Sequence, residues 1–312
     1  MTTKPEEKYS LIIIGGGPAG MTASVYAARY EIKHLIITEN IGGLTYGSHK
    51  IENFPSYPEI IGIELVQKME NQVKKLGGKF FLDKVNRIKR KNNVFQISTF
   101  SGNSFIAKTI LLSYGTERNK LGVKGEKKLT GRGVSYCFTC DADFFKGRIV
   151  GIVGGGDSAV RAAIYLAKIA RKVFLIYRGN QLKAGEKWQK MMLQRPNIET
   201  IQDNEIKEII GKNRLEKVKL KNLFNQSDEL LLDGLFIEIG GSPNQRLIRE
   251  LSLETDLQGY IKINQEGKTN QRGIWAAGDI TTGSNGFRQI LTACAEGAIA
   301  VGSIHQYLSK IK

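Results

Sequence analysis

The sequence predicts an α/β fold in which one strand–turn–helix unit occurs twice. The first unit consists of an apolar strand at Tyr9–Ile14, a glycine-rich turn at Gly15–Gly20 and an alanine-rich helix over Met21–Tyr30. The second unit has its strand, turn and helix at Arg148–Val153, Gly154–Ala159 and Ala159–Ile169. Because a strand that runs through such a turn into a helix begins a Rossmann-like unit, we expect two domains of this kind.

The first turn has the glycine spacing of a dinucleotide-binding site. Gly15 permits the tight turn, Gly17 lets the backbone approach a pyrophosphate, and Gly20 lets helix and strand pack closely. The helix N-terminus adds N–H groups and a favourable dipole for the phosphates. The next strand, His34–Thr38, ends at Glu39, where a carboxylate can accept hydrogen bonds from the adenosine ribose. These features together predict a first dinucleotide site.

The second turn has the variant of this spacing in which the third small residue is alanine. Gly154 and Gly156 occupy the first two positions and Ala159 the third. Asp157 and Ser158 lie between them at the start of the helix, so we count both as candidate binding residues for a second dinucleotide.

The strand after the second turn, Val173–Tyr177, ends with a cation where an acid would favour NAD(H). Arg178 follows it directly and Lys183 comes five residues later. Positive charge here suits a ribose 2′-phosphate and therefore NADPH rather than NADH. The alternative is that both are ordinary surface charges.

A pair of cysteines, Cys137 and Cys140, lies between the two units, and Asp141 follows the second. This spacing lets one thiolate attack a target disulfide while the other resolves the mixed disulfide. A zinc site is disfavoured, since the chain has no second cysteine pair and no histidine pair to complete it. Buried structural thiols remain an alternative, and Cys294 is interpreted as a packed thiol.

Composition limits the classes of partner. The chain has 312 residues and a net charge of +16, but its basic residues are spread along the sequence. The densest cluster, Lys84–Lys91, is interpreted as a solvated hairpin, so we expect no nucleic-acid partner. The positive charge is better explained by a field that steers acidic protein partners or by a plain lysine-rich surface. The polar N-terminus and the absence of an apolar run near the roughly 20 residues of a membrane span predict a cytoplasmic protein without a membrane partner.

Other segments complete the expected architecture. Gly42 and Gly43 lie in a long connection and permit close backbone approach to a ligand. Asp279 ends an apolar strand, which places its carboxylate at the edge where ligands bind. Gly122–Gly133 is interpreted as a crossing between domains and Gly240–Pro243 as a hinge. Further strands are expected at 80–85, 94–99, 104–107 and 109–113, and further helices at 64–76 and 292–308.

Together these residues resemble the low-molecular-weight thioredoxin reductases, FAD enzymes with two dinucleotide folds. The resemblance covers roughly residues 8 to 308 and includes the motifs Glu52–Pro55, Cys137–Asp141 and Arg288-Gln289. It implies two Rossmann-like domains of three-layer ββα type, the second inserted into the first. The FAD-binding domain would comprise 1–116 and 244–312, and the NAD(P)H-binding domain 117–243 would carry the cysteine pair. Family members are homodimers.

The resemblance also implies roles for individual residues. Gly15, Gly17 and Gly20 would hold the FAD pyrophosphate and Asp279 its ribitol. The residues implied to lie near the flavin are Asn53, Arg288 and Gln289. Cys140 would be the flavin-proximal thiol, Cys137 the thiol that attacks the protein disulfide, and Asp141 the acid–base residue.

The implied function is thioredoxin-disulfide reduction, in which electrons pass from NADPH through FAD and the dithiol to a thioredoxin- or glutaredoxin-like protein. Three departures from the family pattern occur at Gly179, Leu44 and Tyr114, where the pattern has arginine, glutamine and threonine. Because Gly179 weakens phosphate recognition, the alternatives are a ferredoxin-dependent reductase and an NADH-preferring enzyme. A flavin thiol oxidase and a non-catalytic nucleotide-sensing or DNA-binding module are the other readings.

Overall fold

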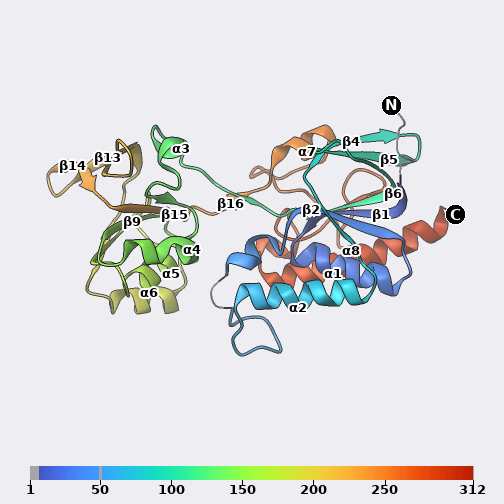
Figure 1. Cartoon of the computed structure of the whole chain (residues 1–312), viewed down its shortest axis with the longest axis horizontal. Coiled ribbons are helices and arrows are strands. Elements are labelled where there is room, and N and C mark those ends of the chain that lie inside the picture. The colour runs from blue at the N-terminus through green and yellow to red at the C-terminus, as the bar shows by residue number, and fades with distance from the viewer. Residues whose placement is uncertain (1–6, 49–50, 312) are drawn as a thin grey trace. The chain divides into compact units, whose positions relative to one another are not determined.

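The computed structural model describes residues 7–48 and 51–311 of the chain. It divides into two compact units, one formed by the chain up to Glu117 and from Ser242 onward, the other by Arg118–Gly241 (Figure 1). The second unit is therefore inserted into the first, and its bounds differ by one or two residues from those expected. The two connections, β7 (Glu117–Arg118) and β16 (Gly241–Ser242), pair with each other as a two-stranded sheet.

The first unit is built on a seven-stranded sheet that divides at β6 (Ser104–Leu112). The other strands are β1 (Glu7–Gly16), β2 (His34–Ile41), β3 (Phe80–Leu82), β4 (Val85–Lys91), β5 (Val94–Thr99) and β17 (Ile274–Ala276). The first half of β6 pairs antiparallel with β5, while its second half pairs parallel with β17. Strands β1, β2 and β3 continue the parallel layer.

Other elements cover both faces of the parallel strands β1, β2 and β3. Figure 1 shows α1 (Pro18–Arg29), α2 (Gly62–Lys75) and α8 (Ile290–Lys310) on one side of these strands and α7 (Gln245–Glu250) with the β4–β5 pair on the other. Leu11 and Ile13 of β1 belong to the hydrophobic cluster of the α1–α8 side, whereas Ile12 and Ile14 belong to the opposite cluster. Burial on both faces explains why Leu11–Ile14, in the buried half of β1, is a continuous apolar run.

The second unit repeats the arrangement at smaller size. Its parallel sheet has the order β11 (Ile198–Ile201), β10 (Lys172–Ile176), β9 (Ile149–Val153), β15 (Gly234–Ile237) and β8 (Val134–Ser135). A three-stranded antiparallel sheet comprises β12 (Ile206–Ile210), β13 (Lys217–Phe224) and β14 (Ser227–Leu231). The helices are α3 (Glu126–Leu129), α4 (Phe138–Asp141), α5 (Asp157–Leu166) and α6 (Glu186–Leu193). A short 3₁₀ helix at Ala142–Phe145 also lies in this unit, whereas those at Gly43–Gly47 and Ser284–Gly286 lie in the first unit.

Three local expectations need correction. The basic cluster Lys84–Lys91 does belong to a hairpin, because β4 pairs antiparallel with β5, but it forms a strand of the sheet and its Val85 and Ile88 are buried rather than solvated. The two strands expected at 104–107 and 109–113 are one strand, β6, which changes partners along its length. Gly122–Gly133 is not the crossing, because it lies within the second unit and includes the buried Glu126 and Leu129 of α3.

Among the described residues, no helix is long and apolar enough to cross a membrane.

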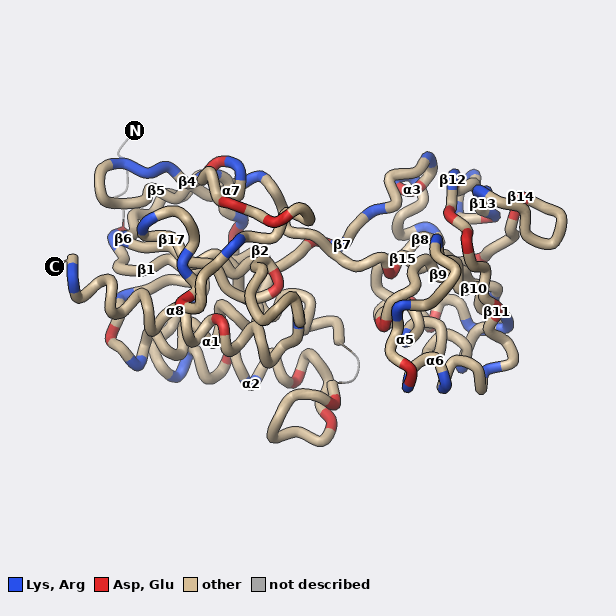
Figure 2. Tube along the Cα trace, turned by 180° about the vertical axis from the view of Figure 1, so that it is seen from behind, with Lys and Arg blue, Asp and Glu red and all other residues tan. Residues whose placement is uncertain are grey.

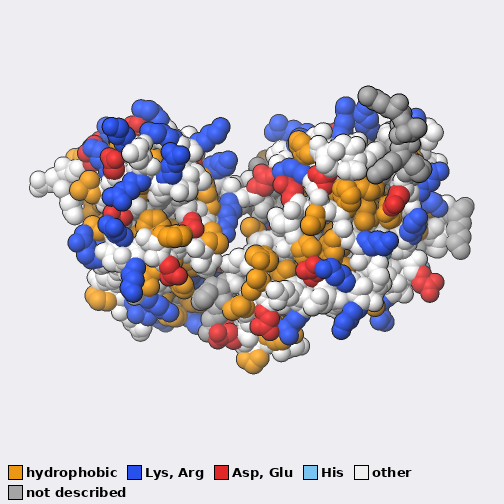
Figure 3. Space-filling model, viewed as in Figure 1, with side chains coloured by type: hydrophobic (Ala, Val, Ile, Leu, Met, Phe, Trp, Pro, Cys, Tyr) orange, Lys and Arg blue, Asp and Glu red, His pale blue; other side chains and the backbone are white. Residues whose placement is uncertain are grey.

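Lys and Arg residues occur on many elements of both units (Figure 2). On the face shown in Figure 3, acidic and apolar side chains lie among the basic ones on each unit. The excess positive charge is therefore dispersed over this surface, as the sequence indicated.

Candidate active site

The first glycine turn is shaped by steric limits at Gly15 and Gly20. Gly15 has a φ of +114°, and a Cβ there would lie 2.4 Å from the Ser113 carbonyl oxygen. A Cβ at Gly20 would lie 1.9 Å from the Gly15 oxygen. At Gly17, by contrast, no described atom lies within 4 Å of an added Cβ. The backbone at Gly17 is therefore open to a ligand, as a pyrophosphate-binding turn requires.

The segment after β2 meets this turn. Gly42 and Gly43 have positive φ values of 98° and 54°, and a Cβ at Gly43 would lie 3.6 Å from the Gly17 Cα. The Gly42 N–H donates to the Gly16 carbonyl oxygen at 2.8 Å. Two glycine backbones that approach each other beside a helix N-terminus form a cradle that fits a dinucleotide phosphate.

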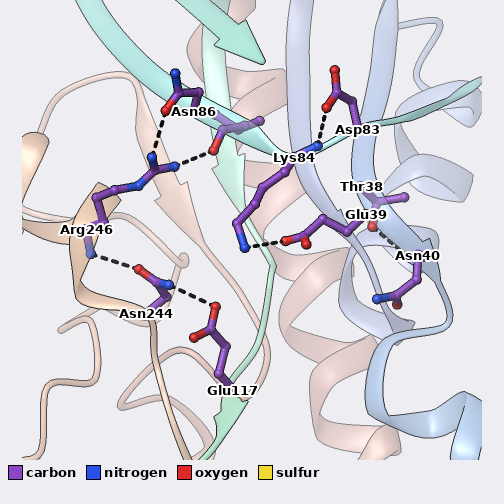
Figure 4. A network of polar contacts seen from close by, with 10 residues as sticks. Thr38, Glu39, Asn40, Asp83, Lys84, Asn86, Glu117, Asn244 and Arg246 are labelled. Carbon is purple, nitrogen blue, oxygen red and sulfur yellow. Dashed lines mark hydrogen bonds and ion pairs between the residues drawn. The ribbon is translucent and has the colours of Figure 1, made fainter. Parts of the chain in front are cut away.

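Glu39 lies near the carboxyl end of β2 and is exposed. Its carboxylate forms an ion pair with the Lys84 ammonium at 2.8 Å (Figure 4). Lys84 was not anticipated, because it comes from the segment between β3 and β4, far along the chain. The pair holds the carboxylate near the strand end while leaving it accessible to solvent.

Figure 4 also shows how side chains of the first unit hold the chain next to the two connections, β7 and β16. Arg246 donates to the Asn86 side chain and to the Val85 carbonyl oxygen at 2.8 and 2.6 Å. Asn244 donates to the Glu117 carboxylate at 2.8 Å. Tyr114, which replaces the family's threonine, donates its hydroxyl to the Asn244 carbonyl oxygen at 3.3 Å.

Asp279 follows β17 and has charged neighbours. Burial raises the pKa of Asp279; the Arg288 guanidinium lowers it and the Glu296 carboxylate raises it. The Arg288 guanidinium carbon lies 3.5 Å from the Tyr260 ring centroid. Its buried Nε has no hydrogen-bond partner among the described residues. A buried donor without a partner beside a half-buried carboxyl fits a site for a polar cofactor.

Glu296 on α8 was missed by the sequence analysis. It accepts hydrogen bonds from the Gly278 N–H and the Thr281 hydroxyl, both at 2.8 Å, and from the Ser284 hydroxyl at 2.7 Å. Glu296 thus holds the loop that carries Asp279. The available signal was an acid within a helix of otherwise small and apolar residues.

Two residues expected near a flavin come together in the first unit. The Asn53 amide donates to the Gln289 side-chain oxygen at 2.9 Å, although 236 positions separate them. Gln289 also caps the N-terminus of α8. Leu44, which stands where the family has glutamine, is 50% exposed.

The second glycine turn has the same steric pattern as the first. Gly154 has a φ of +142°, and a Cβ there would lie 2.2 Å from the Glu238 carbonyl oxygen. Gly156 has no described atom within 4 Å of an added Cβ. Asp157 accepts a hydrogen bond from the Gly185 N–H at 2.8 Å, and Ser158 donates to the Glu238 carboxylate.

Arg178 and Lys183 both lie near the carboxyl end of β10 and are exposed. The Lys183 N–H donates to the Gly155 carbonyl oxygen at 2.7 Å, so the segments that follow β9 and β10 are joined. Gly179 contributes no side chain. The structure therefore places two candidate cations near the second turn.

The cysteine pair forms a disulfide in the second unit, with a Cα–Cα distance of 5.3 Å. Cys137 occupies the N-cap position of α4, and its N–H donates to the Ser135 hydroxyl oxygen at 3.0 Å. Its sulfur lies 3.3 Å from the Thr139 hydroxyl. Cys140 is exposed and Cys137 half-buried. The Asp141 N–H donates to the Cys137 carbonyl oxygen at 3.2 Å. Both sulfurs and a carboxyl group thus occupy one short, partly accessible helix.

Comparison with known proteins defines the class. The pyridine nucleotide-disulphide oxidoreductase family matches residues 9–297, and the chain belongs to this family. It is therefore an oxidoreductase, and thioredoxin reductases of this family use FAD and NADPH.

Within this family, the chain is similar to thioredoxin reductases over nearly its whole length. The chain is 37% identical to thioredoxin reductases of Listeria innocua, over 98% of this chain and 96% of the relative, and of Bacillus subtilis, over 98% and 97%. The solved thioredoxin reductase of Lactococcus lactis matches with a TM-score of 0.90 at 35% identity, over 97% of this chain and 99% of that one. The solved thioredoxin reductase of T. acidophilum matches with a TM-score of 0.88 at 31% identity, over 98% of this chain and 100% of that one.

Proposed function

We propose that the protein is a thioredoxin-disulfide reductase that uses NADPH, FAD and the Cys137–Cys140 pair to reduce a thioredoxin- or glutaredoxin-like protein. The observation that carries this proposal is the disulfide on a short helix within a unit that also contains a dinucleotide-type turn. The relatives that match nearly the whole chain are thioredoxin reductases, which supports the same assignment.

We assign the two cofactors to separate units. The first unit would hold FAD at the turn Gly15–Gly20, with Glu39 at the ribose and Asp279 at the ribitol. The second unit would hold NADPH at the turn Gly154–Ala159, with Arg178 and Lys183 at the 2′-phosphate. The chemistry supplied by the bound cofactors is two-electron transfer from the nicotinamide, through the flavin, to a disulfide.

The chain's own residues carry out the thiol–disulfide exchange. The Cys137 thiolate attacks one sulfur of the partner disulfide, which forms a mixed disulfide and releases one partner thiolate. The Cys140 thiolate then attacks the Cys137 sulfur, releases the second partner thiolate and re-forms the Cys137–Cys140 bond. We assign to Asp141 the delivery of a proton to a departing thiolate. The partner disulfide gains two electrons and two protons, and the dithiol loses them.

We further propose that the enzyme acts as a homodimer in the cytoplasm, where thiols are kept cycling. The ferredoxin-dependent alternative is not favoured, because the relatives are thioredoxin reductases and the second turn keeps a sterically intact form at Gly154 and Gly156.

One experiment tests the proposed function. Purified protein with its bound flavin is titrated anaerobically with NADPH and, separately, NADH, while the flavin absorbance is followed, and a thioredoxin disulfide is then added. We expect bleaching by NADPH and recovery of the flavin band on adding the disulfide. Protein that binds no flavin, or flavin that neither coenzyme reduces, would refute the proposal.

Coenzyme preference gives a separate prediction. A charge-assisted hydrogen bond contributes about 1.5–3 kcal/mol, and the forked arginine form is the stronger one. With one arginine and one lysine, NADPH should be preferred to NADH by about 10- to 100-fold in kcat/KM. Arg178→Ala should nearly remove this preference, and Gly179→Arg should widen it.

Lys219→Ala is the matched control, because Lys219 is a cation on β13 that pairs with Asp228 at 3.3 Å. Its ratio of kcat/KM values for the two coenzymes should equal that of the unmodified enzyme. An unchanged ratio in Arg178→Ala would show that this strand end does not recognise the phosphate.

A further inference from the structure

Glu238 is a buried acid with one unused acceptor. It follows β15, and its side chain is only 9% exposed. One carboxylate oxygen accepts the Ser158 hydroxyl, while the other, Oε1, is buried without a hydrogen-bond partner among the described residues. Its ion-pair partner, Arg118, lies 3.8 Å from Oε1, beyond hydrogen-bond distance. A buried carboxylate oxygen left in this state indicates a missing donor.

The position of Glu238 in the sheet indicates which donor is missing. The chain winds from β9 through α5 to β10 on one side, whereas β15 pairs with β9 on the other side. Strand order therefore reverses between β9 and β15, and ligands of open α/β sheets bind at such a point, beyond the carboxyl ends of the strands. Glu238 lies at this edge, since its carbonyl oxygen limits the space at Gly154.

The chemistry of a carboxylate selects one part of the coenzyme. An ionised phosphate has no proton to donate, so Glu238 is not suited to bind one. The adenosine end with its 2′-phosphate is expected on the β10 side, near Arg178. The β15 side then receives the nicotinamide half. Because Ser158 is at the helix start where the pyrophosphate binds, the nearest donors beyond it are the hydroxyls of the adjoining ribose.

We propose that Glu238 recognises the nicotinamide half of the coenzyme by accepting a hydrogen bond from its ribose. This inference rests on the proposed function, because it assumes that the second unit binds NADP(H). The Ser158 hydroxyl acts as a positioning group that fixes the carboxylate through its other oxygen. Arg118 offsets part of the negative charge near the pyrophosphate.

The test compares two ligands by isothermal titration calorimetry on the oxidised, flavin-loaded enzyme. NADP⁺ contains the nicotinamide ribose, whereas adenosine 2′,5′-bisphosphate does not. We expect Glu238→Ala to weaken NADP⁺ about ten- to hundredfold, the range for a hydrogen bond to a charged group, and to leave the bisphosphate unchanged. Equal weakening of both ligands, unchanged affinity for both, or tighter binding of both would overturn the proposal.

A coenzyme analogue separates the ribose from the carboxamide. The 3-acetylpyridine analogue of NADP⁺ keeps the ribose hydroxyls but has no amide N–H. Glu238→Ala should weaken the analogue by the same factor as NADP⁺. If the analogue binds the unmodified and Ala proteins equally well, the carboxamide is the donor and the assignment to the ribose is wrong.

Two further variants keep the result interpretable. Glu238→Gln preserves the size of the side chain and is expected to weaken NADP⁺ in the same direction but by less, so it carries the test if the Ala protein unfolds. Glu229→Gln changes an acid on β14 that pairs with Lys217, and its affinity for NADP⁺ should not change. Wild-type protein that does not bind NADP⁺ at all would instead refute the proposed function, which is a different outcome from each of those above.

Discussion

Replacement of either Cys137 or Cys140 by serine is expected to abolish reduction of the partner disulfide. Each exchange step needs a thiolate, one to attack the partner and one to resolve the mixed disulfide. Turnover with a thioredoxin should fall by at least about a thousandfold, the scale on which loss of a nucleophile acts. Reduction of the flavin by the nicotinamide coenzyme uses neither thiol, so anaerobic bleaching by NADPH should persist in both variants.

Cys294→Ser is the matched control for the cysteine variants. Cys294 lies on α8, its sulfur lies 3.9 Å from the Pro18 carbonyl oxygen, and burial raises the pKa of its thiol. A thiol with a raised pKa is a poor nucleophile at neutral pH, so turnover should be nearly unchanged. Substantial thioredoxin reduction by either Cys137→Ser or Cys140→Ser would contradict the dithiol mechanism.

The glycine turns could be predicted from the sequence because the strand, turn and helix of each unit are consecutive segments of the chain. A strand, a glycine at positive φ and a helix are all local, and Gly15 and Gly154 adopt φ values of +114° and +142°. Leu11–Ile14 of β1 is a continuous apolar run, which a segment buried on both faces requires. The fold class and the two units followed from these local patterns.

Contacts between distant segments could not be predicted in the same way. Strand β6 pairs with β5 and then with β17, and nothing within residues 104–112 indicates that change of partner. The cluster Lys84–Lys91 was expected to be solvated because its charge hides the two buried residues of β4, which is one strand of the β4–β5 hairpin. Periodicity shows which side of an element is buried, but not which element covers it.

The same limit applies to the candidate site. Lys84 meets Glu39 only through the pairing of distant segments, and Asn53 meets Gln289 across 236 positions. Nothing in the sequence singles out Glu238, because its importance depends on its buried oxygen and on its contact with Ser158. The resemblance to a family identified Asn53 and Gln289, whereas Glu238 and Glu296 required the structure.

The second large effect is expected at Gly20, where substitution should damage the fold of the first unit. In Gly20→Ala the new Cβ would lie 1.9 Å from the Gly15 oxygen and 2.8 Å from the Ser113 hydroxyl, so the backbone must move. Overpacking of this kind costs about 1–3 kcal/mol, more than the roughly 1 kcal/mol that alanine gains over glycine in a helix. The flavin-free protein should unfold at lower temperature and should bind FAD weakly or not at all.

Gly17→Ala is the informative contrast, because it adds the same methyl group in the same turn but into open space. Gly17 has a φ of −77°, which alanine adopts without strain, and no described atom lies within 4 Å of the new Cβ. The flavin-free variant should therefore unfold at the same temperature as the unmodified flavin-free protein.

The new methyl group would still stand between the backbone and a pyrophosphate. Because this removes the equivalent of one charge-assisted hydrogen bond, the affinity for FAD should fall about tenfold or more. Thermal unfolding of the flavin-free proteins and FAD titration separate the two effects. Equal unfolding temperatures for both variants would contradict the steric argument at Gly20. Undiminished FAD affinity in Gly17→Ala would show that this turn does not bind the pyrophosphate as proposed.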